Sequence, residues 1–236
     1  INHSLFTVLI NGYNVIFFAG MSHIIYTFDI NSKIMETIDV KEEVIRQIYT
    51  NEDKVNFICN RITIMSMSCQ TVNHNILAFG GSNSIFCVKN VKDNTYLFIN
   101  TDRDIFSETY SISFSGDGKF IATGHEDGKC ILWSAENYKI VNIFKINEII
   151  VKNQFFESTK ERHSNYISCV RFSPDSKYLA ISTSESSVIF YDTCYFKTIN
   201  SINLNIEPFP IYGMEFNNKG DSLVVSMKEK NYVFCQ

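Results

Sequence analysis

The sequence has 236 residues, of which 45% are hydrophobic and 14% aromatic, so it can bury a large core as one all-β domain. Its formal net charge is −4 and its isoelectric point is about 5.8, which lacks the strongly basic balance of a nucleic-acid binder, so no nucleic-acid partner is expected. The longest apolar runs, such as VIFFAGM at 15–21, are far too short to propose a membrane span in this chain.

Short strand patterns, rich in β-branched and aromatic residues and bounded by turn residues, run through almost the whole chain. The first group contains SLFTVLI, NVIFFAG, HIIYTFDI and KIMETIDV, which is enough for four strands. The last group contains three strands. The five groups occupy about 4–40, 62–101, 110–145, 166–204 and 211–236, with inserts at 41–61 and 146–165.

One phrase of 21 residues occurs three times without a gap, at 113–133, 171–191 and 215–235. Each copy reads as a strand end, a tight polar turn, a strand closing on a small residue, a second turn, and a strand ending in Trp133, Tyr191 or Cys235. The small residues closing the second strands are Gly20, Gly80, Gly124, Ser182 and Ser226. They are spaced 60, 44, 58 and 44 residues apart, and the shorter spacing fits one four-stranded propeller blade.

Alternation in the first strand of each copy predicts which side chains are buried. Ile112 and Phe114 share one face, and Ser111 and Ser113 lie on the other. The same alternation puts Val170 opposite Arg171, and Met214 opposite Glu215.

The two inserts break the period without disturbing the strand groups beside them. Their segments 41–49 and 146–156 look less like strand, and each is a short helix, an extra hairpin or a disordered loop. Because insertions in repeat proteins map to loops on one face, we expect the inserts to be mobile or to face partners. The candidate partner-binding residues in the second insert are Phe155, Phe156, Lys160 and Arg162. The alternative is that this insert is the relic of a degenerate blade.

Chemistry-bearing residues form no recognisable catalytic pattern. The five histidines stand at no metal-ligand spacing, and the carboxylate pairs lie in turns or polar stretches, so no enzyme activity, metal or cofactor is expected. The seven cysteines include no C-x-x-C pair, which favours reduced thiols and a cytoplasmic or nuclear compartment. The chain opens on Ile1, so the native start is expected to be absent, and a missing segment with an anchor would place the protein at the cytosolic face of a membrane.

The segment 163–192 resembles the WD-repeat β-propellers, with a His before the first strand, a Ser-Pro-Asp turn and an aromatic-Asp pair ending the third strand. The resemblance implies that a His, a turn Asp, a Ser or Thr and a Trp form a hydrogen-bonded tetrad in each blade. No unit has the whole set, since the third lacks a preceding His and the fourth has Glu185 in the Asp place. The residues expected to play such structural roles are His163, Asp127, Trp133, Tyr191 and Asp192.

The resemblance implies an all-β propeller of four-stranded antiparallel blades, with five blades visible in a single domain over 1–236. A seven-bladed ring would need about 300 residues. Either the ring has fewer blades, or the chain is a fragment of a seven-bladed ring, or a partner completes it.

Such a propeller is expected to be a non-catalytic scaffold for other proteins. The alternative is a guanine-nucleotide exchange factor for a small GTPase of vesicle coat assembly, because the order of good and degenerate repeats is loosely similar to the endoplasmic-reticulum propeller of that activity. The segment MSHIIYTF after Gly20 lacks the Gly-rich, ion-binding loop that this exchange factor uses.

The last group of strands predicts an exposed sheet edge at 231–236. An unpaired edge is a template for strand addition. We expect it to be covered by sequence absent from this chain, by the 1–10 segment in a different register, or by a strand from another chain.

Deleting 150–162 should abolish partner binding and leave the melting temperature unchanged if the second insert is a partner-facing loop. Thermal unfolding and a binding assay on the same variant measure both. Unfolding of the deletion variant would contradict the loop interpretation and favour a structural remnant of a blade.

Overall fold

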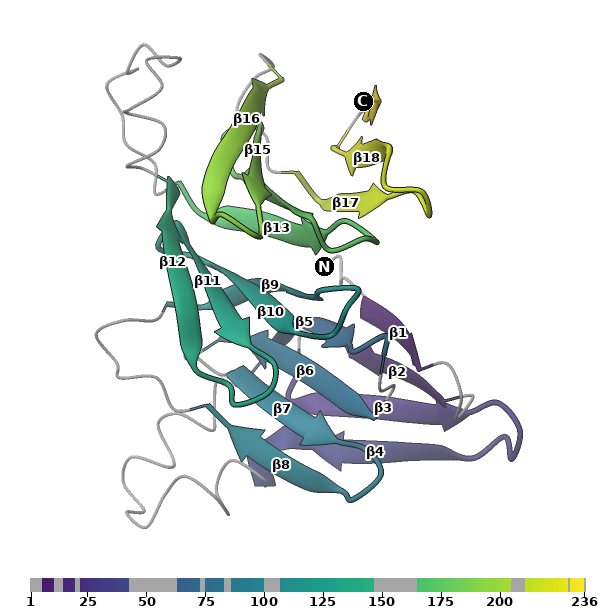
Figure 1. Ribbon diagram of the computed structural model, residues 1–236. Helices are drawn as coiled ribbons and strands as arrows, with labels where there is room; N and C mark the ends of the chain where they lie inside the picture. The colour runs from purple at the N-terminus through teal and green to yellow at the C-terminus, as the bar shows by residue number, and fades with distance from the viewer. Residues whose placement is uncertain are drawn as a thin grey trace. The chain divides into compact units, whose positions relative to one another are not determined.

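The computed structural model describes residues 6–10, 15–19, 22–42, 63–72, 75–82, 86–99, 107–146, 165–204, 211–228 and 230–235 (Figure 1). These residues form five antiparallel sheets, four with four strands and one with three. Within them, helical conformation is confined to 40–42 and 146, at the points where the two inserts begin. The expected all-β architecture of blade-like sheets is therefore confirmed. The described residues include no helix long and apolar enough to cross a membrane.

The chain divides into two compact units, Ile1–Thr109 and Tyr110–Gln236, each of which is described by itself. The first unit contains two sheets, called blades 1 and 2. Blade 1 consists of β1 (Phe6–Ile10), β2 (Val15–Ala19), β3 (Ile24–Asp29) and β4 (Met35–Asp39). Blade 2 consists of β5 (Ile64–Cys69), β6 (Ile76–Gly81), β7 (Phe86–Asn90) and β8 (Thr95–Phe98).

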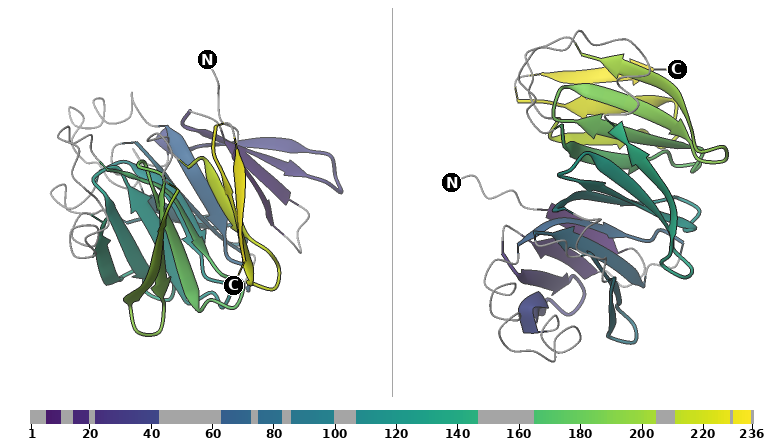
Figure 2. Two further views of the ribbon diagram at one scale, coloured as in Figure 1. Left: turned by 90° about the horizontal axis from the view of Figure 1, so that it is seen from above. Right: turned by 90° about the vertical axis from the view of Figure 1, so that its left-hand side faces the viewer.

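The second unit contains three sheets, called blades 3 to 5, and blade 4 lies between the other two (Figure 2). Blade 3 consists of β9 (Thr109–Phe114), β10 (Phe120–His125), β11 (Lys129–Ser134) and β12 (Ile140–Lys145). Blade 4 consists of β13 (Ile167–Phe172), β14 (Tyr178–Thr183), β15 (Ser187–Asp192) and β16 (Lys197–Asn203). Blade 5 consists of β17 (Gly213–Phe216), β18 (Ser222–Ser226) and β19 (Asn231–Cys235). The grouping of all five sheets into one propeller domain over 1–236 stays a prediction.

The hairpin between the second and third strands has one register in blades 2, 3 and 4. Leu77 pairs with Lys89, Ile121 with Trp133 and Leu179 with Tyr191. In blade 5 the corresponding Leu223 pairs with Phe234, because this hairpin is one residue shorter. The expectation that Cys235 takes the place of Trp133 is therefore wrong; Phe234 takes it, and Cys235 is exposed.

The first strand belongs to blade 1. β1 pairs with β2 residue by residue, from Phe6 opposite Ala19 to Ile10 opposite Val15. The three alternatives for the edge at 231–236 stay predictions.

The turns between the first and second strands repeat the same chemistry. Ser115 donates its hydroxyl to Asp117 at 2.7 Å and accepts the Phe120 amide at 2.9 Å, and Ser173 does the same with Asp175 and Tyr178 at the same distances. One residue of each turn has positive φ, namely Gly118, Ser176 and Gly220. Glycine adopts this conformation at no steric cost, whereas the serine must be held there by its surroundings.

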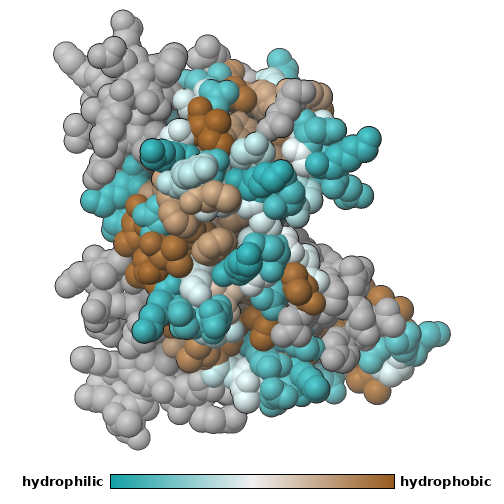
Figure 3. Space-filling view, viewed as in Figure 1, coloured by the Kyte–Doolittle hydropathy of each residue, from teal (hydrophilic) through white to brown (hydrophobic). Residues whose placement is uncertain are grey.

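The cores lie between sheets. One cluster joins blades 1 and 2 through residues that include Phe17, Ile64 and Phe79. Another joins blades 3 and 4, where the Phe144 and Tyr191 rings lie 4.3 Å apart between centroids. The apolar faces predicted from the first strands are confirmed, since Ile112, Val170 and Met214 are buried. The outermost strands are more exposed, and apolar side chains of β12 reach the surface (Figure 3).

Six cysteines lie in the described residues, and all six are free thiols there. Burial raises the pKa of the Cys69 thiol to about 11, and it also raises the pKa of Cys130. Since the thiolate is the reactive form, these two side chains behave as small apolar core residues.

Gly124 allows blades 3 and 4 to approach closely. A Cβ at this position would lie 2.4 Å from Cγ2 of Ile167 on the neighbouring blade. Gly124→Ala should therefore lower the free energy of unfolding by about 1–3 kcal/mol, as expected for overpacking. Gly213→Ala is the matched control, because nothing lies within 4 Å of a Cβ there, and chemical denaturation should show a change of under about 0.5 kcal/mol. Equal effects of the two substitutions would contradict this packing.

Candidate interaction surface

A chain of buried hydrogen bonds links the second and third strands of blade 3. The Trp133 indole donates from Nε1 to Oγ1 of Thr123 at 2.9 Å, and Oγ1 lies 2.8 Å from Nε2 of His125. All three side chains are almost fully buried. A buried indole N–H needs an acceptor, and the Thr123 hydroxyl supplies it.

His125 was missed at the sequence level. Its imidazole comes from the end of β10 instead of from the segment before β9, where a histidine was expected. The available signal was the T-G-H spacing, because residues two apart on a strand point to the same face. In this blade the histidine reaches the Thr123 hydroxyl from the same strand.

The two other expected structural residues of blades 3 and 4 organise turns. Asp127 accepts the Lys129 amide at 3.2 Å and pairs with the Lys129 ammonium. Asp192 accepts the amides of Cys194 and Tyr195 at 2.8 and 3.0 Å. Both carboxylates hold hairpin backbones in place, and their expected part in a tetrad stays a prediction.

In blade 4, Tyr191 stands at the register position that Trp133 has in blade 3. The environment of its hydroxyl differs from that of the Trp133 indole N–H. Ile181 stands where blade 3 has Thr123, and the buried Tyr191 hydroxyl has no hydrogen-bond partner among the described residues. Burial raises the pKa of Tyr191. The nearby Thr198 side chain lowers this pKa in part, but it makes no hydrogen bond of normal geometry to the Tyr191 hydroxyl. His163 lies outside the described residues, and Glu185 accepts from the Asn165 amide at 3.3 Å.

In blade 2 the same register position holds Lys89, whose side chain is buried. Its ammonium donates to the Asn94 side-chain oxygen and the Tyr96 hydroxyl, and it lies 3.9 Å from the Tyr96 ring centroid. These contacts compensate for removing the charge from water. The position therefore accepts a tryptophan, a tyrosine or a lysine, and in blades 2 and 3 neighbouring groups match the polar end of the side chain.

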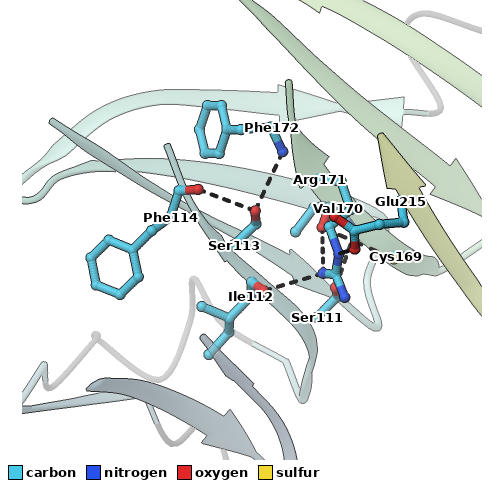
Figure 4. A network of polar contacts seen from close by, with 9 residues as sticks. All are labelled: Ser111, Ile112, Ser113, Phe114, Cys169, Val170, Arg171, Phe172 and Glu215. Atoms are coloured by element: carbon cyan, nitrogen blue, oxygen red, sulfur yellow. Dashed lines mark hydrogen bonds and ion pairs between the residues drawn. The ribbon is translucent and has the colours of Figure 1, made fainter. Parts of the chain in front are cut away.

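The innermost strands of blades 3 to 5 are joined by side chains (Figure 4). Ser111 and Ser113 accept the backbone amides of Val170 and Phe172 at 3.0 and 3.3 Å. The Arg171 guanidinium donates to the Val170 carbonyl at 2.9 Å and, from Nε, to the Glu215 carboxylate at 3.4 Å. The polar face predicted for these strands thus carries bonds between blades, and Ser111 and Ser113 are buried by them.

Three tyrosines gather where the innermost strands of blades 3 to 5 begin, and they are called the tyrosine cluster: Tyr110, Tyr166 and Tyr212. The Tyr110 and Tyr166 rings meet edge to face with centroids 5.2 Å apart. Burial, and secondarily the Tyr212 phenol, raises the pKa of Tyr166. Tyr212 is 64% exposed, so the cluster reaches the surface.

The backbone of the tyrosine cluster is fixed by the neighbouring strands. The Tyr166 amide donates to Oγ of Ser184 at 3.2 Å, and its carbonyl accepts the Ser184 amide at 2.9 Å. The Tyr212 amide donates to the Ser226 carbonyl at 2.9 Å. Aromatic side chains held in this way present contact area at little entropic cost.

The sequence candidates of the second insert, Phe155, Phe156, Lys160 and Arg162, lie outside the described residues. Within the described ranges no group of three or more His, Cys, Asp or Glu side chains could hold a metal ion. The sequence did contain one clue to the tyrosine cluster. The second insert ends at Asn165, directly before Tyr166, so its carboxyl end adjoins that cluster.

Comparison with known proteins finds a family similarity in two segments of the chain. The family model of the WD domain, G-beta repeat, matches residues 104–134 and 156–192, which include β9 to β11 and β13 to β15. Two segments of the chain are thus similar to WD repeats.

Curated relatives support the WD-repeat assignment over part of the chain. Protein HIRA of Dictyostelium discoideum is 30% identical over 92 residues, which are 39% of this chain and 8% of the relative. The transcriptional corepressor LEUNIG_HOMOLOG of Arabidopsis thaliana is 27% identical over 129 residues, 53% of this chain and 14% of the relative. Protein HIR1 of Candida albicans is 27% identical over 95 residues, 40% of this chain and 10% of the relative. The chain thus spans a small part of the relatives it matches.

Trp133 and Tyr191 should respond differently to loss of their polar atoms. Trp133→Ala should lower the free energy of unfolding by about 3–5 kcal/mol. Trp133→Phe should lower the free energy of unfolding by about 1–3 kcal/mol. The Thr123 hydroxyl loses the indole N–H as a donor, and the smaller ring fills less of the core. Tyr191→Phe should be neutral or stabilising by up to about 1 kcal/mol, since it removes a buried hydroxyl without a partner.

Equilibrium denaturation of the three variants checks these values. If Tyr191→Phe lowered the free energy of unfolding by more than about 1 kcal/mol, the Tyr191 hydroxyl would have to make a hydrogen bond. If Trp133→Ala lowered it by less than about 1 kcal/mol, the indole would have to be exposed.

Proposed function

We propose that this chain is a non-catalytic scaffold that binds partner proteins through the tyrosine cluster and the second insert. The observation that carries the proposal is the tyrosine cluster itself, an aromatic surface fixed by backbone hydrogen bonds and exposed at Tyr212. Tyrosine is enriched among residues that dominate binding at protein interfaces.

The distribution of polar side chains supports binding over catalysis. Ser111, Ser113 and Arg171, on the polar face of the innermost strands, bond neighbouring blades. A catalytic site needs polar groups that converge on a substrate with perturbed pKa values. Here these three polar side chains hold neighbouring sheets together, and the tyrosine cluster supplies aromatic surface for contact with a partner protein.

Partners are expected to be proteins, with no nucleic acid. One relative is named a transcriptional corepressor, and this favours the nucleus over the cytoplasm as the compartment of this chain. None of the three relatives named above is an exchange factor by its name, and no observation favours the small-GTPase alternative. Nucleotide-exchange assays on small GTPases separate that alternative from a scaffold.

Tyr212→Ala should weaken capture of partners from native lysate by tenfold or more, with little change in melting temperature, because the side chain is 64% exposed. Quantitative affinity capture followed by mass spectrometry measures the effect. Tyr195→Ala is the matched control, since Tyr195 is 74% exposed on the turn between β15 and β16, away from the tyrosine cluster. Equal losses for the two variants, or none for Tyr212→Ala, would count against the proposed surface.

A further inference from the structure

Aromatic side chains close the space between blades 3 and 4. Phe196, on the turn before β16, meets Phe120, the first residue of β10, edge to face with ring centroids 6.3 Å apart. Both rings pack on the apolar cluster that includes Leu132 and Tyr191. Apolar contacts therefore fill this space as far as the turns.

The equivalent space between blades 1 and 2 is open. Val15, the first residue of β2, stands where blade 3 has Phe120. Asn94 has the positive φ and the turn position that Phe196 has in blade 4. Val15 and Asn94 both line a pocket of about 540 Å³, called the blade 1–2 pocket. All the residues that line it belong to the first unit, and both sheets of that unit contribute.

Two further replacements make the blade 1–2 pocket polar. By strand register, Thr27 of blade 1 stands where blade 3 has Leu132, and Lys89 of blade 2 stands where blade 4 has Tyr191. Leu132 and Tyr191 are almost fully buried, whereas Thr27 and Lys89 line the pocket. Polar groups at a contact between sheets forfeit apolar burial, and departures of this kind occur mainly at functional sites. The blade 1–2 pocket is therefore a candidate binding site.

The charge of the lining indicates the kind of ligand. Four carboxylates of blade 1 line the pocket, those of Asp29, Glu36, Asp39 and Glu42, and Lys89 is the one cationic residue that lines it. Negative charge thus exceeds positive charge by three, and a cleft lined mainly by one sign of charge concentrates ligands of the opposite sign.

Two of these carboxylates already bind backbone amides. Asp29 accepts the amides of Asn31 and Ser32 at 2.8 and 3.1 Å, and these bonds, that of Ser32 first, lower the pKa of the Asp29 carboxyl. Asp39 accepts the Lys41 amide at 2.9 Å. Asp29 and Asp39 therefore hold the turns at the two ends of β4 and add negative potential to the pocket.

The Glu36 carboxylate is available to a ligand. Its side chain is exposed, and among the described residues no hydrogen bond or ion pair engages the carboxylate. Ile34, Glu36 and Ile38 alternate along β4 and all line the pocket, as does Val15 of β2. A carboxylate flanked by apolar side chains fits a ligand with a cationic head and an apolar stem, since such a stem packs on apolar surface while the head pairs with the acid.

We propose that the blade 1–2 pocket binds an organic cation with an alkyl stem, such as an alkylguanidinium or alkylammonium group. The head pairs with Glu36, and the stem lies on Val15, Ile34 and Ile38. An organic cation fits better than a metal ion, because three or more metal-ligating side chains nowhere gather in the part of the chain that the structure describes. The site lies in the first unit, so it goes beyond the scaffold function proposed for the tyrosine cluster of the second.

A pair of matched ligands tests the charge requirement. The probe is N-acetylarginine methylamide, and isothermal titration calorimetry on the 236-residue protein at low ionic strength measures its binding. N-acetylcitrulline methylamide has nearly the same shape without the charge, and it should bind at least tenfold more weakly. Added salt should weaken binding of the charged probe, because it screens exposed charges.

Spermidine distinguishes two sources of the cation. A site for a free polyamine should bind spermidine more tightly than the arginine derivative, and a site for a protein side chain should show the reverse order. Either order supports the blade 1–2 pocket as a cation site, provided that binding depends on Glu36.

Protein variants test the pocket itself. Glu36→Gln should weaken binding of the arginine derivative at least fivefold. Glu136→Gln is the matched control, because Glu136 is an exposed carboxylate on the turn between β11 and β12 and does not line the pocket; it should leave binding unchanged. Val15→Phe supplies the ring that Phe120 supplies in blade 3, so it should also weaken binding at least fivefold and leave the circular dichroism of the strands unchanged.

The proposal is overturned if the arginine derivative gives no binding heat at about 10 mM, a concentration that fills even a millimolar site. Equal binding of the arginine and citrulline derivatives, or equal losses for Glu36→Gln and Glu136→Gln, would also overturn it. If Glu36→Gln failed to fold, unchanged binding to a folded Val15→Phe variant would reject the pocket. None of these results bears on capture of partners through Tyr212, so the scaffold function is tested separately.

Discussion

Burial of one sheet face against the next is the constraint on which the rest of the fold depends. A single four-stranded sheet has too little apolar area to be stable in water, so its neighbours must complete its core. Gly124 shows how tight this packing is, because the backbone of blade 3 there lies against Ile167 of blade 4. The small residue that ends the second strand is therefore a requirement of the interface between sheets.

The inner strands add directional bonds to this apolar packing. Ser111 and Ser113 satisfy amides of β13, which has its own sheet partner on only one side. An unpaired amide buried between sheets would cost more than a typical hydrogen bond contributes. The serines therefore solve a problem that the sheet architecture creates, and they fix how β9 and β13 lie along one another.

The repeat made the architecture of this chain predictable, whereas the details of the sites were less so. Strand periodicity and turn chemistry are local properties, so the sheets and the buried face with Ile112 and Phe114 could be read from single strands. His125 was missed because the family pattern points to a histidine before the first strand, although its spacing from Thr123 puts both side chains on one face of β10. Phe234 was displaced from its expected register by a hairpin one residue shorter, which an ungapped comparison of repeats conceals. In the tyrosine cluster, Tyr110 and Tyr212 share one repeat position, whereas Tyr166 lies two residues earlier in its repeat, so periodicity marks only part of the cluster.

The single tryptophan of the chain has a spectroscopic consequence. Trp133 is buried in blade 3 and hydrogen-bonded to Thr123, so its emission reports the solvation of Tyr110–Gln236 and is silent on Ile1–Thr109. Circular dichroism senses the strands of both units. A difference between the two signals during unfolding would therefore show directly whether the units melt as one cooperative body or in sequence.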